Sequence, residues 1–255
     1  MHDQENVKKS LDNVVVWCKE NGMELNVLKC QVVSFHRGSQ VRHFNYTING
    51  ASLQRVESVK DLGVYITSNL NSLDHIANTI SRANSLIGFI FRSTRNFHSP
   101  NTLVCLYKSL VRPILEYGSI IWSPCQLNHI GMLDGVQDRF LRLLGVRLGF
   151  PYRGSPVDQL SAQHGLQSLH HRRRIADLVF LYKLVNGTLD CPSLLQLVDF
   201  AVPRRTRSLS CFRRKYQPTN YSYNTGLSRL IRYGAEVAPN VDFFWHVCFF
   251  VQKCV

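Results

Sequence analysis

The sequence predicts an α+β fold that is mainly α-helical, with a small antiparallel β unit at about residues 31–67 followed by a helical bundle. Within 31–67 the chain holds short runs rich in β-branched and aromatic residues, and Asn49-Gly50 is a strong signal for a tight hairpin turn. From residue 73 onward, apolar residues recur every three or four positions, which is the period of a helix. A chain of 255 residues, 45% of them hydrophobic, is long enough and apolar enough to bury a core.

A first helix is expected before the β unit, because five apolar residues share one stripe and Asn21-Gly22 supplies a stop signal. The residues of that stripe are Val7, Leu11, Val14, Val15 and Cys18. The β unit then consists of the runs "CQVVSF", "HFNYTI" and "DLGVYI".

The helices of the bundle follow from their apolar stripes, which we expect to form the core. Stripes at about 73–90, 103–121 and 130–144 mark three helices, and we expect Pro113 to bend or break the second. A short helix at about 157–164 precedes a longer one that begins at Leu169 and ends at Asn186-Gly187. Ile175, Leu178, Tyr182 and Val185 are its expected buried face, and Glu116 is a lone carboxylate that we interpret as a structural hydrogen-bond partner.

The formal net charge of +13 is unevenly distributed, since residues 201–255 carry 9 basic and 2 acidic side chains. An excess of this size is typical of a protein that binds a polyanion, although a solvated surface that only keeps the protein soluble has the same composition. Between Ala201 and Ala235 no acidic residue occurs, and tyrosines alternate with the basic side chains. Cations bind phosphates and rings stack on bases, so this segment is a candidate nucleic-acid interface, or else a basic linker. Its first arginines are Arg204, Arg205 and Arg207.

A second cluster of cations is the run "LHHRRR", in which Arg172, Arg173 and Arg174 follow two histidines. These arginines could clamp phosphates, or they could form the solvated start of a helix.

The eight cysteines include no CxxC pair and no set at zinc-ligand spacing. We therefore expect reduced, mostly buried thiols and an intracellular protein, cytoplasmic or nuclear. The C-terminal run "FFWHVCFFV" is about half as long as a membrane-spanning helix requires, so no membrane partner is expected.

Six motifs, in order, resemble the region downstream of the catalytic motif in reverse transcriptases of non-LTR retrotransposons, in their jockey-like branch. Together they cover roughly residues 5–235. They are "WCKENGMELNVLKCQVVSFHR", "YTINGASLQRVESVKDLGVYI", "LYKSLVRPILEYGSIIWSP", "VQDRFLRLLG", "LHHRRRIADLVFLYKLVNG" and "FAVPRRTRS".

The resemblance implies roles for single residues. Lys29 matches the palm lysine near the phosphates of the incoming nucleotide, where an ammonium stabilises charge on a leaving phosphate. Lys60 and Gly63 match the hairpin that grips the primer end, and a glycine there permits close approach of a nucleic-acid backbone. Taken alone, Lys29 reads as an ordinary solvated lysine and Gly63 as a turn residue.

The family is an RNA-directed DNA polymerase, a nucleotidyltransferase that holds two Mg²⁺ ions on aspartates upstream of the first helix seen in this chain. This sequence contains no Asp-Asp dipeptide and no Walker-type loop, GxSxG or HExxH motif. We therefore expect this chain alone to be inactive, to bind no cofactor, and to lack the fingers and most of the palm.

The resemblance divides the chain into a palm remnant with the primer-grip hairpin (1–70), thumb-like helices (71–150), a helical extension (151–200) and a basic, aromatic-rich segment (201–255). The first hypothesis is a reverse transcriptase fragment that binds RNA or primer–template duplex, with possible self-association through its uncovered half-palm. The alternatives are a decayed reading frame, favoured by the unusual end "DFFWHVCFFVQKCV", and a repurposed helical interaction module.

Overall fold

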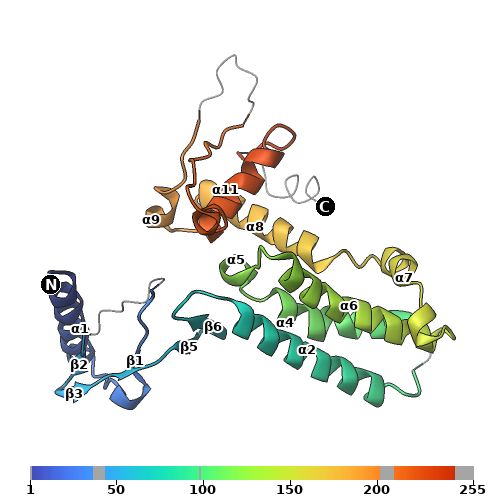
Figure 1. Ribbon diagram of the computed structural model, residues 1–255, viewed down its shortest axis with the longest axis horizontal. Helices are drawn as coiled ribbons and strands as arrows, with labels where there is room; N and C mark the ends of the chain where they lie inside the picture. Colours follow the sequence, from blue (N-terminus) through green and yellow to red (C-terminus); the bar gives the residue numbers. More distant parts are fainter. Residues whose placement is uncertain (1, 37–43, 98, 202–209, 245–255) are drawn as a thin grey trace. The chain divides into compact units, whose positions relative to one another are not determined.

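The computed structural model describes residues 2–36, 44–97, 99–201 and 210–244, and it confirms the mainly helical α+β fold (Figure 1). The chain divides into two compact units, Met1–His75 and Ile76–Val255. The boundary falls in the first turn of α2 (Leu73–Ser93), a few residues beyond the expected one at 70/71. The second unit is not divided further at 151 or 201.

The described residues of unit 1 form a long helix, a single 3₁₀ turn and six short strands. Strands β2 and β3 are antiparallel around Asn49 (φ 51°) and Gly50 (φ 80°), which confirms the hairpin turn predicted there. Strands β5 and β6 form a second antiparallel hairpin. The bounds are α1 His2–Glu20, η1 Val27–Lys29, β1 Gln31–Val32, β2 Thr47–Ile48, β3 Ala51–Ser52, β4 Gln54–Arg55, β5 Ser58–Asp61 and β6 Val64–Thr67.

One strand pair differs from the prediction. β1 and β4 are parallel, with Gln31 opposite Gln54, so the β unit is not wholly antiparallel. The β2–β3 hairpin lies between them in the chain, and parallel neighbours require such an intervening connection.

Much of the apolar surface of unit 1 is uncovered. The stripe predicted to be the buried face of α1 buries only Cys18, whereas Val7 and Val14 are 46% and 47% exposed. The strand that packs against α1 is β2, and two residues are too few to cover a helix of 19 residues. Exposed apolar surface of this kind favours association. Self-association of the chain remains a prediction.

Unit 2 is built from helices, and its core confirms the predicted stripes of α2 and α6. Ile76 and Ile87 of α2 are fully buried, as are Phe140 and Leu144 of α6. The remaining bounds are α3 Pro100–Leu106, η2 Tyr107–Val111, α4 Arg112–Glu116, α5 Ser119–Trp122, α6 Leu127–Arg147, η3 Tyr152–Gly154, α7 Val157–Gln163, α8 Leu169–Val185, α9 Pro192–Leu195, α10 Asn220–Tyr223 and α11 Gly226–Val237.

The helix predicted at 103–121 is not broken at Pro113 but continues past it to Glu116. A π-helical segment, η2, precedes this proline and accommodates its missing backbone donor. The wider turn adds one residue, so the buried stripe continues through Val111 and Leu115, while Leu110 is 43% exposed. The chain breaks instead at Gly118, whose φ of 63° requires a residue that tolerates the left-handed region.

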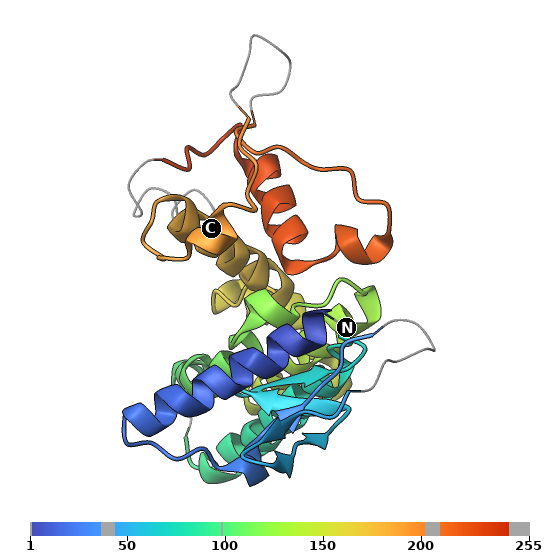
Figure 2. The same ribbon diagram turned by 90° about the vertical axis from the view of Figure 1, so that its left-hand side faces the viewer.

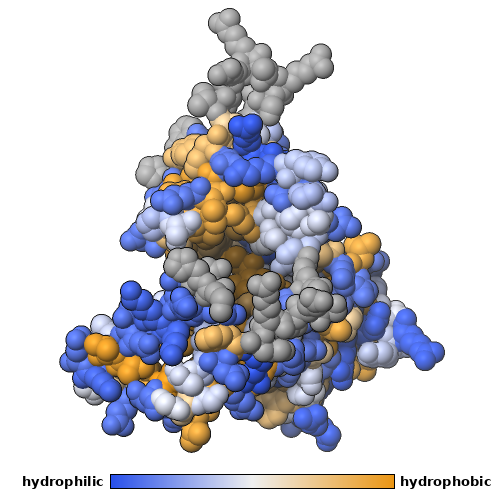
Figure 3. Space-filling view, turned by 60° about the vertical axis from the view of Figure 1, so that its left-hand side comes forward, coloured by the Kyte–Doolittle hydropathy of each residue, from blue (hydrophilic) through white to orange (hydrophobic). Residues whose placement is uncertain are grey.

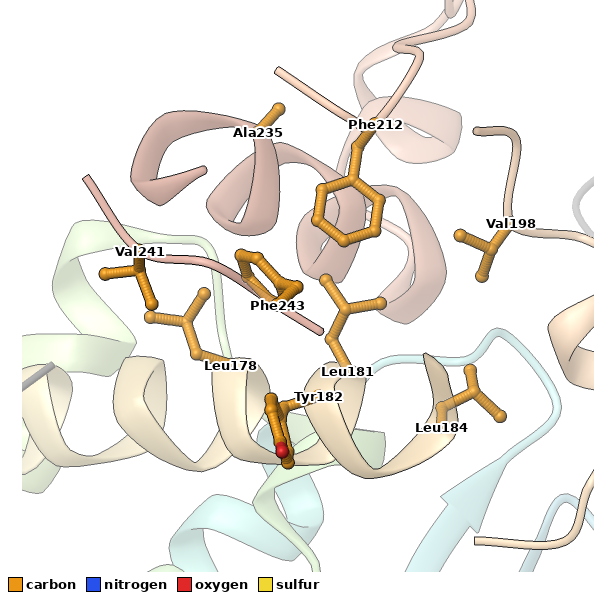
Figure 4. Close-up of a cluster of buried hydrophobic side chains, with 9 residues drawn as sticks. All are labelled: Leu178, Leu181, Tyr182, Leu184, Val198, Phe212, Ala235, Val241 and Phe243. Carbon is orange, nitrogen blue, oxygen red and sulfur yellow. The ribbon is translucent and has the colours of Figure 1, made fainter. Parts of the chain in front are cut away.

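The far half of α8 carries a second apolar cluster (Figure 4), which fixes the C-terminal part of unit 2. Phe212 and Phe243 meet edge to face, with ring centroids 4.8 Å apart, above Leu181. A Cβ on Gly234 of α11 would lie 2.5 Å from Leu181 Cδ2, so glycine permits the close packing of α11 on α8. The described residues beyond 210 are therefore folded structure rather than a linker. The cluster comprises Leu178, Leu181, Tyr182, Leu184, Val198, Phe212, Ala235, Val241 and Phe243.

Tyr107 gives a prediction about stability at high pH. Its ring stacks on Phe140 at 4.3 Å, and its hydroxyl donates to Gln137 Oε1 at 3.1 Å. Burial, and secondarily Glu116, raises the pKa of Tyr107 well above its ordinary value of 10.0. The unfolded chain therefore loses the tyrosine proton at a lower pH than the folded chain does. The contribution of Tyr107 to the free energy of unfolding is fully present below about pH 10, and it falls by about 1.4 kcal/mol per pH unit above it. Urea unfolding from pH 8 to 11 should show a shallower loss for Tyr107→Phe, and equal slopes would contradict this.

Candidate nucleic-acid interface

In unit 1 the structure places Lys29 and the Lys60 hairpin on separate elements. Lys29 ends the single turn η1 and is exposed. Lys60 lies on β5, where its Nζ is 5.4 Å from the ring centroid of Tyr65 on the paired strand β6.

The turn between β5 and β6 has an uncommon composition. Leu62 (φ 44°) and Gly63 (φ 89°) both adopt the left-handed conformation of a two-residue hairpin turn. Leucine rarely adopts a positive φ, and the Leu62 side chain is 85% exposed. The hairpin therefore presents a large apolar side chain beside Gly63, the position that the sequence analysis assigns to close contact with nucleic acid.

The three arginines of "LHHRRR" diverge from the start of α8, and none of them is a free surface cation. Arg172 makes a two-point ion pair with Glu116 of α4, which confirms the structural role expected for that carboxylate. Arg174 donates to Glu236 of α11 at 2.8 Å and lies over the ring of Tyr233.

Arg173 differs most from its predicted role. Its side chain is buried, at 1% exposure, and its three guanidinium nitrogens have no hydrogen-bond partner in the described part of the chain. Burial lowers the pKa of Arg173, against the attraction of nearby Asp134, Glu116 and Asp177. A guanidinium in this position cannot reach a phosphate at the surface. The expectation of a surface arginine, whether clamping phosphates or merely solvated, is therefore wrong for this residue.

A buried ion pair between α8 and α11 escaped the sequence analysis. Arg229 Nε donates to Asp177 Oδ2 at 2.8 Å, and its Nη2 donates to the carbonyl of Ile120 on α5, also at 2.8 Å. The sequence does hold a signal for it, because Arg173 and Asp177 share the i, i+4 stripe of Leu169 and Leu181. Charged residues on an apolar stripe indicate a buried charge network. The buried face of α8 is thus wider than the predicted one, of which Leu178 and Tyr182 are buried.

Arg204, Arg205 and Arg207 lie outside the described residues. Downstream of them, cations and tyrosines of α8, α10, α11 and the segment before α10 form what we name the C-terminal surface. Figure 2 shows the ribbons of these elements, and Figure 3 shows hydrophilic residues beside an apolar area on the face in view. Arg232 lies 4.2 Å from the ring centroid of Tyr223 and 5.4 Å from that of Tyr233. The C-terminal surface comprises Arg174, Arg213, Arg214, Tyr216, Tyr223, Arg232 and Tyr233.

The C-terminal surface keeps unpaired charge and open rings. Tyr216 is 89% and Tyr223 49% exposed. Arg213 is exposed and forms no ion pair within the described residues, and Arg214 approaches Glu236 only at 4.0 Å. Lys215, by contrast, is held by Asp199 at 2.7 Å. Exposed tyrosines beside excess positive charge suit a nucleic-acid strand.

Helix α2 carries a basic face that was not predicted from the sequence. Arg82, Phe89 and Arg92 point away from the buried stripe, and Phe89 is 55% exposed. Helix α2 has one acidic residue, Asp74 in its first turn. Spacings of three and seven residues opposite an apolar stripe are the signal that could have identified this face.

The cysteines differ from the expectation of mostly buried thiols. Of the six in the described part of the chain, Cys18 is buried, whereas Cys105 and Cys125 are exposed, and all six are free. In both exposed cases the side chain lies on an outward position of its segment, where no core residue is required.

Neither a metal site nor a membrane helix emerges from the residues that the structure describes. Across them, no group of three or more His, Cys, Asp or Glu side chains could hold a metal ion. Within the same ranges, no helix combines the length and apolar character needed to cross a bilayer.

Comparison with known proteins gives no family for this chain: no protein-family model, curated protein or solved structure matches it.

Proposed function

We propose that this chain is part of a non-LTR retrotransposon reverse transcriptase and that it binds RNA or primer–template duplex without catalysing polymerisation by itself. The ordered motif resemblance supports the family assignment. The absence of an Asp-Asp dipeptide supports the second half of the proposal, since two-metal phosphoryl transfer requires clustered carboxylates. The acidic side chains of the described residues do not fit two Mg²⁺ ions, so we derive no catalytic step through them.

The observation that carries the binding proposal is the C-terminal surface. The C-terminal surface has four arginines, and among the described residues only Arg174 and Arg214 lie within 4.0 Å of a carboxylate, that of Glu236. Asp199 pairs with Lys215 instead. Arg232 is ordered by its tyrosine neighbours and by its hydrogen bond to the Tyr223 carbonyl at 3.1 Å. An arginine held in place loses less side-chain entropy when it binds a phosphate. The exposed rings of Tyr216 and Tyr223 are available for stacking on bases.

The test is fluorescence anisotropy with labelled single-stranded RNA and an RNA–DNA duplex over a range of salt concentrations. Because each phosphate contact releases counterions, the logarithm of affinity should fall linearly with that of salt, by about 0.7 to 0.9 per contact. Arg213→Gln/Arg214→Gln should weaken binding and reduce the magnitude of this slope by the amount expected for one to two phosphate contacts. The same measurement on Arg204→Gln/Arg205→Gln/Arg207→Gln tests the basic segment beyond the described residues.

The matched control is Lys8→Gln/Lys9→Gln, which removes the same charge from exposed positions of α1. Equal losses from both pairs of substitutions would mean that net charge alone is responsible. A parent protein that binds neither probe at low salt would favour the decayed reading frame.

A further inference from the structure

The π-helical segment of unit 2 borders an open, solvent-facing cavity of about 500 Å³ that the proposed function does not use. One wall is a single face of α3 and η2, at spacings of three and four residues, and the other is the end of α7. A volume of this size suits a small organic molecule. Its lining residues are Asn101, Val104, Cys105, Lys108, Ser109, Gln163 and His164.

The lining is rich in hydrogen-bond donors and holds no carboxylate. Lys108 is half-buried, and its Nζ donates to the carbonyl of His164 at 3.0 Å, which places the ammonium where the two walls meet. That bond uses one of three ammonium protons, and Lys108 has no ion-pair partner among the described residues. His164 Nε2 is buried without a hydrogen-bond partner in the same part of the chain.

We propose that this cavity binds a small organic oxyanion, a phosphate ester or a carboxylate, through the ammonium of Lys108. The Lys108 ammonium has two further protons, which an oxyanion would accept in charge-assisted hydrogen bonds. The amides of Asn101 and Gln163 are further donors on the same walls, whereas the hydroxyl of Ser109 already donates to the carbonyl of Leu106.

Cys105 allows a direct test, because its thiol is free, exposed and part of the cavity lining. The full chain would be treated with iodoacetamide, and the alkylation rates of Cys105 and Cys125 would be followed by peptide mass spectrometry. At a concentration of phenyl phosphate about ten times its dissociation constant, alkylation of Cys105 should slow roughly tenfold, since only a tenth of the sites stay free. Cys125 lies outside the cavity lining and should be unaffected.

Further ligands and variants identify the chemical group that the cavity binds. Benzoate tests the carboxylate source of the oxyanion, and phenol, which has the ring without the charge at neutral pH, should give no protection. Lys108→Met should raise the dissociation constant obtained from this protection at least about tenfold, the loss expected for a hydrogen bond to a charged group. Lys183→Met, at an exposed lysine of α8, should leave it unchanged. Absence of protection by both anions, equal protection by phenol, or full protection in Lys108→Met would each overturn the proposal.

Discussion

Replacing Arg229 by methionine is expected to destabilise unit 2 by about 3–5 kcal/mol, the cost of breaking a buried ion pair by removing one partner. Asp177 is 1% exposed and accepts two hydrogen bonds from this guanidinium, at 2.8 and 3.3 Å. Arg229 also donates to the carbonyls of Ile120 and Ser123 at the end of α5. The substitution therefore leaves a buried carboxylate and two backbone acceptors without a donor.

The loss should depend on pH in a defined direction. Burial already raises the pKa of Asp177 despite the opposing hydrogen bonds of Arg229. Without the guanidinium, the folded-state pKa should rise further above that of the unfolded chain. A carboxyl with a raised folded-state pKa favours folding most below its unfolded pKa, and this contribution is lost as the pH rises through the folded pKa. The deficit of Arg229→Met should therefore be larger at pH 7.5 than near pH 4.

Urea unfolding followed by circular dichroism would measure both effects. Arg229→Met/Asp177→Leu should recover part of the loss, because no unpaired charge is then buried. Arg213→Met removes an exposed arginine of the same segment and should change stability by less than about 0.5 kcal/mol. A single variant at Arg229 that unfolds like the parent would show that the ion pair does not hold α8 and α11 together.

Structural features that depend on neighbouring residues were predicted better than features that depend on residues distant in the sequence. The periods of α2 and α6, the Asn49-Gly50 hairpin and the stop at Gly187 (φ 67°) depend on neighbouring residues, and the sequence predicts them correctly. The wider π-helical turn of η2 was not predictable. It changes which residues face the core, but the spacing of apolar residues in the sequence carries no sign of it. The parallel pairing of β1 with β4 joins residues more than twenty positions apart, beyond the reach of any window of sequence.

The candidate site shows the same division. Composition identified the basic segment, but it could not distinguish cations that bind a partner from cations that hold the fold. Arg172, Arg173 and Arg174 are adjacent in sequence, yet a helix turns successive side chains by about 100°, so one reaches α4, one the interior and one α11. Their roles depend on which carboxylate each one meets, and those carboxylates, Glu116 and Glu236, are more than fifty residues away.

Replacing Arg173 by methionine, in contrast, is expected to stabilise unit 2 by about 1–3 kcal/mol, the desolvation cost of a buried donor that has no hydrogen-bond partner. Its guanidinium is fully buried, and all three nitrogens lack a partner in the part of the chain that the structure describes. Burial lowers the pKa of Arg173 in spite of three neighbouring carboxylates. The folded environment therefore disfavours the charged form, and methionine fills similar space without that cost.

The neighbouring position supplies a control with the opposite sign. Arg172→Met removes the two-point pair with Glu116, which is partly exposed, and should lower stability by up to about 1 kcal/mol. Urea midpoints of the two variants should therefore lie on opposite sides of the parent, although the substitutions are chemically identical and one residue apart. If Arg173→Met instead loses several kcal/mol, the guanidinium must be bonded in solution, by buried water or by one of the carboxylates around it, and the charge cluster would then be a source of stability in this fold.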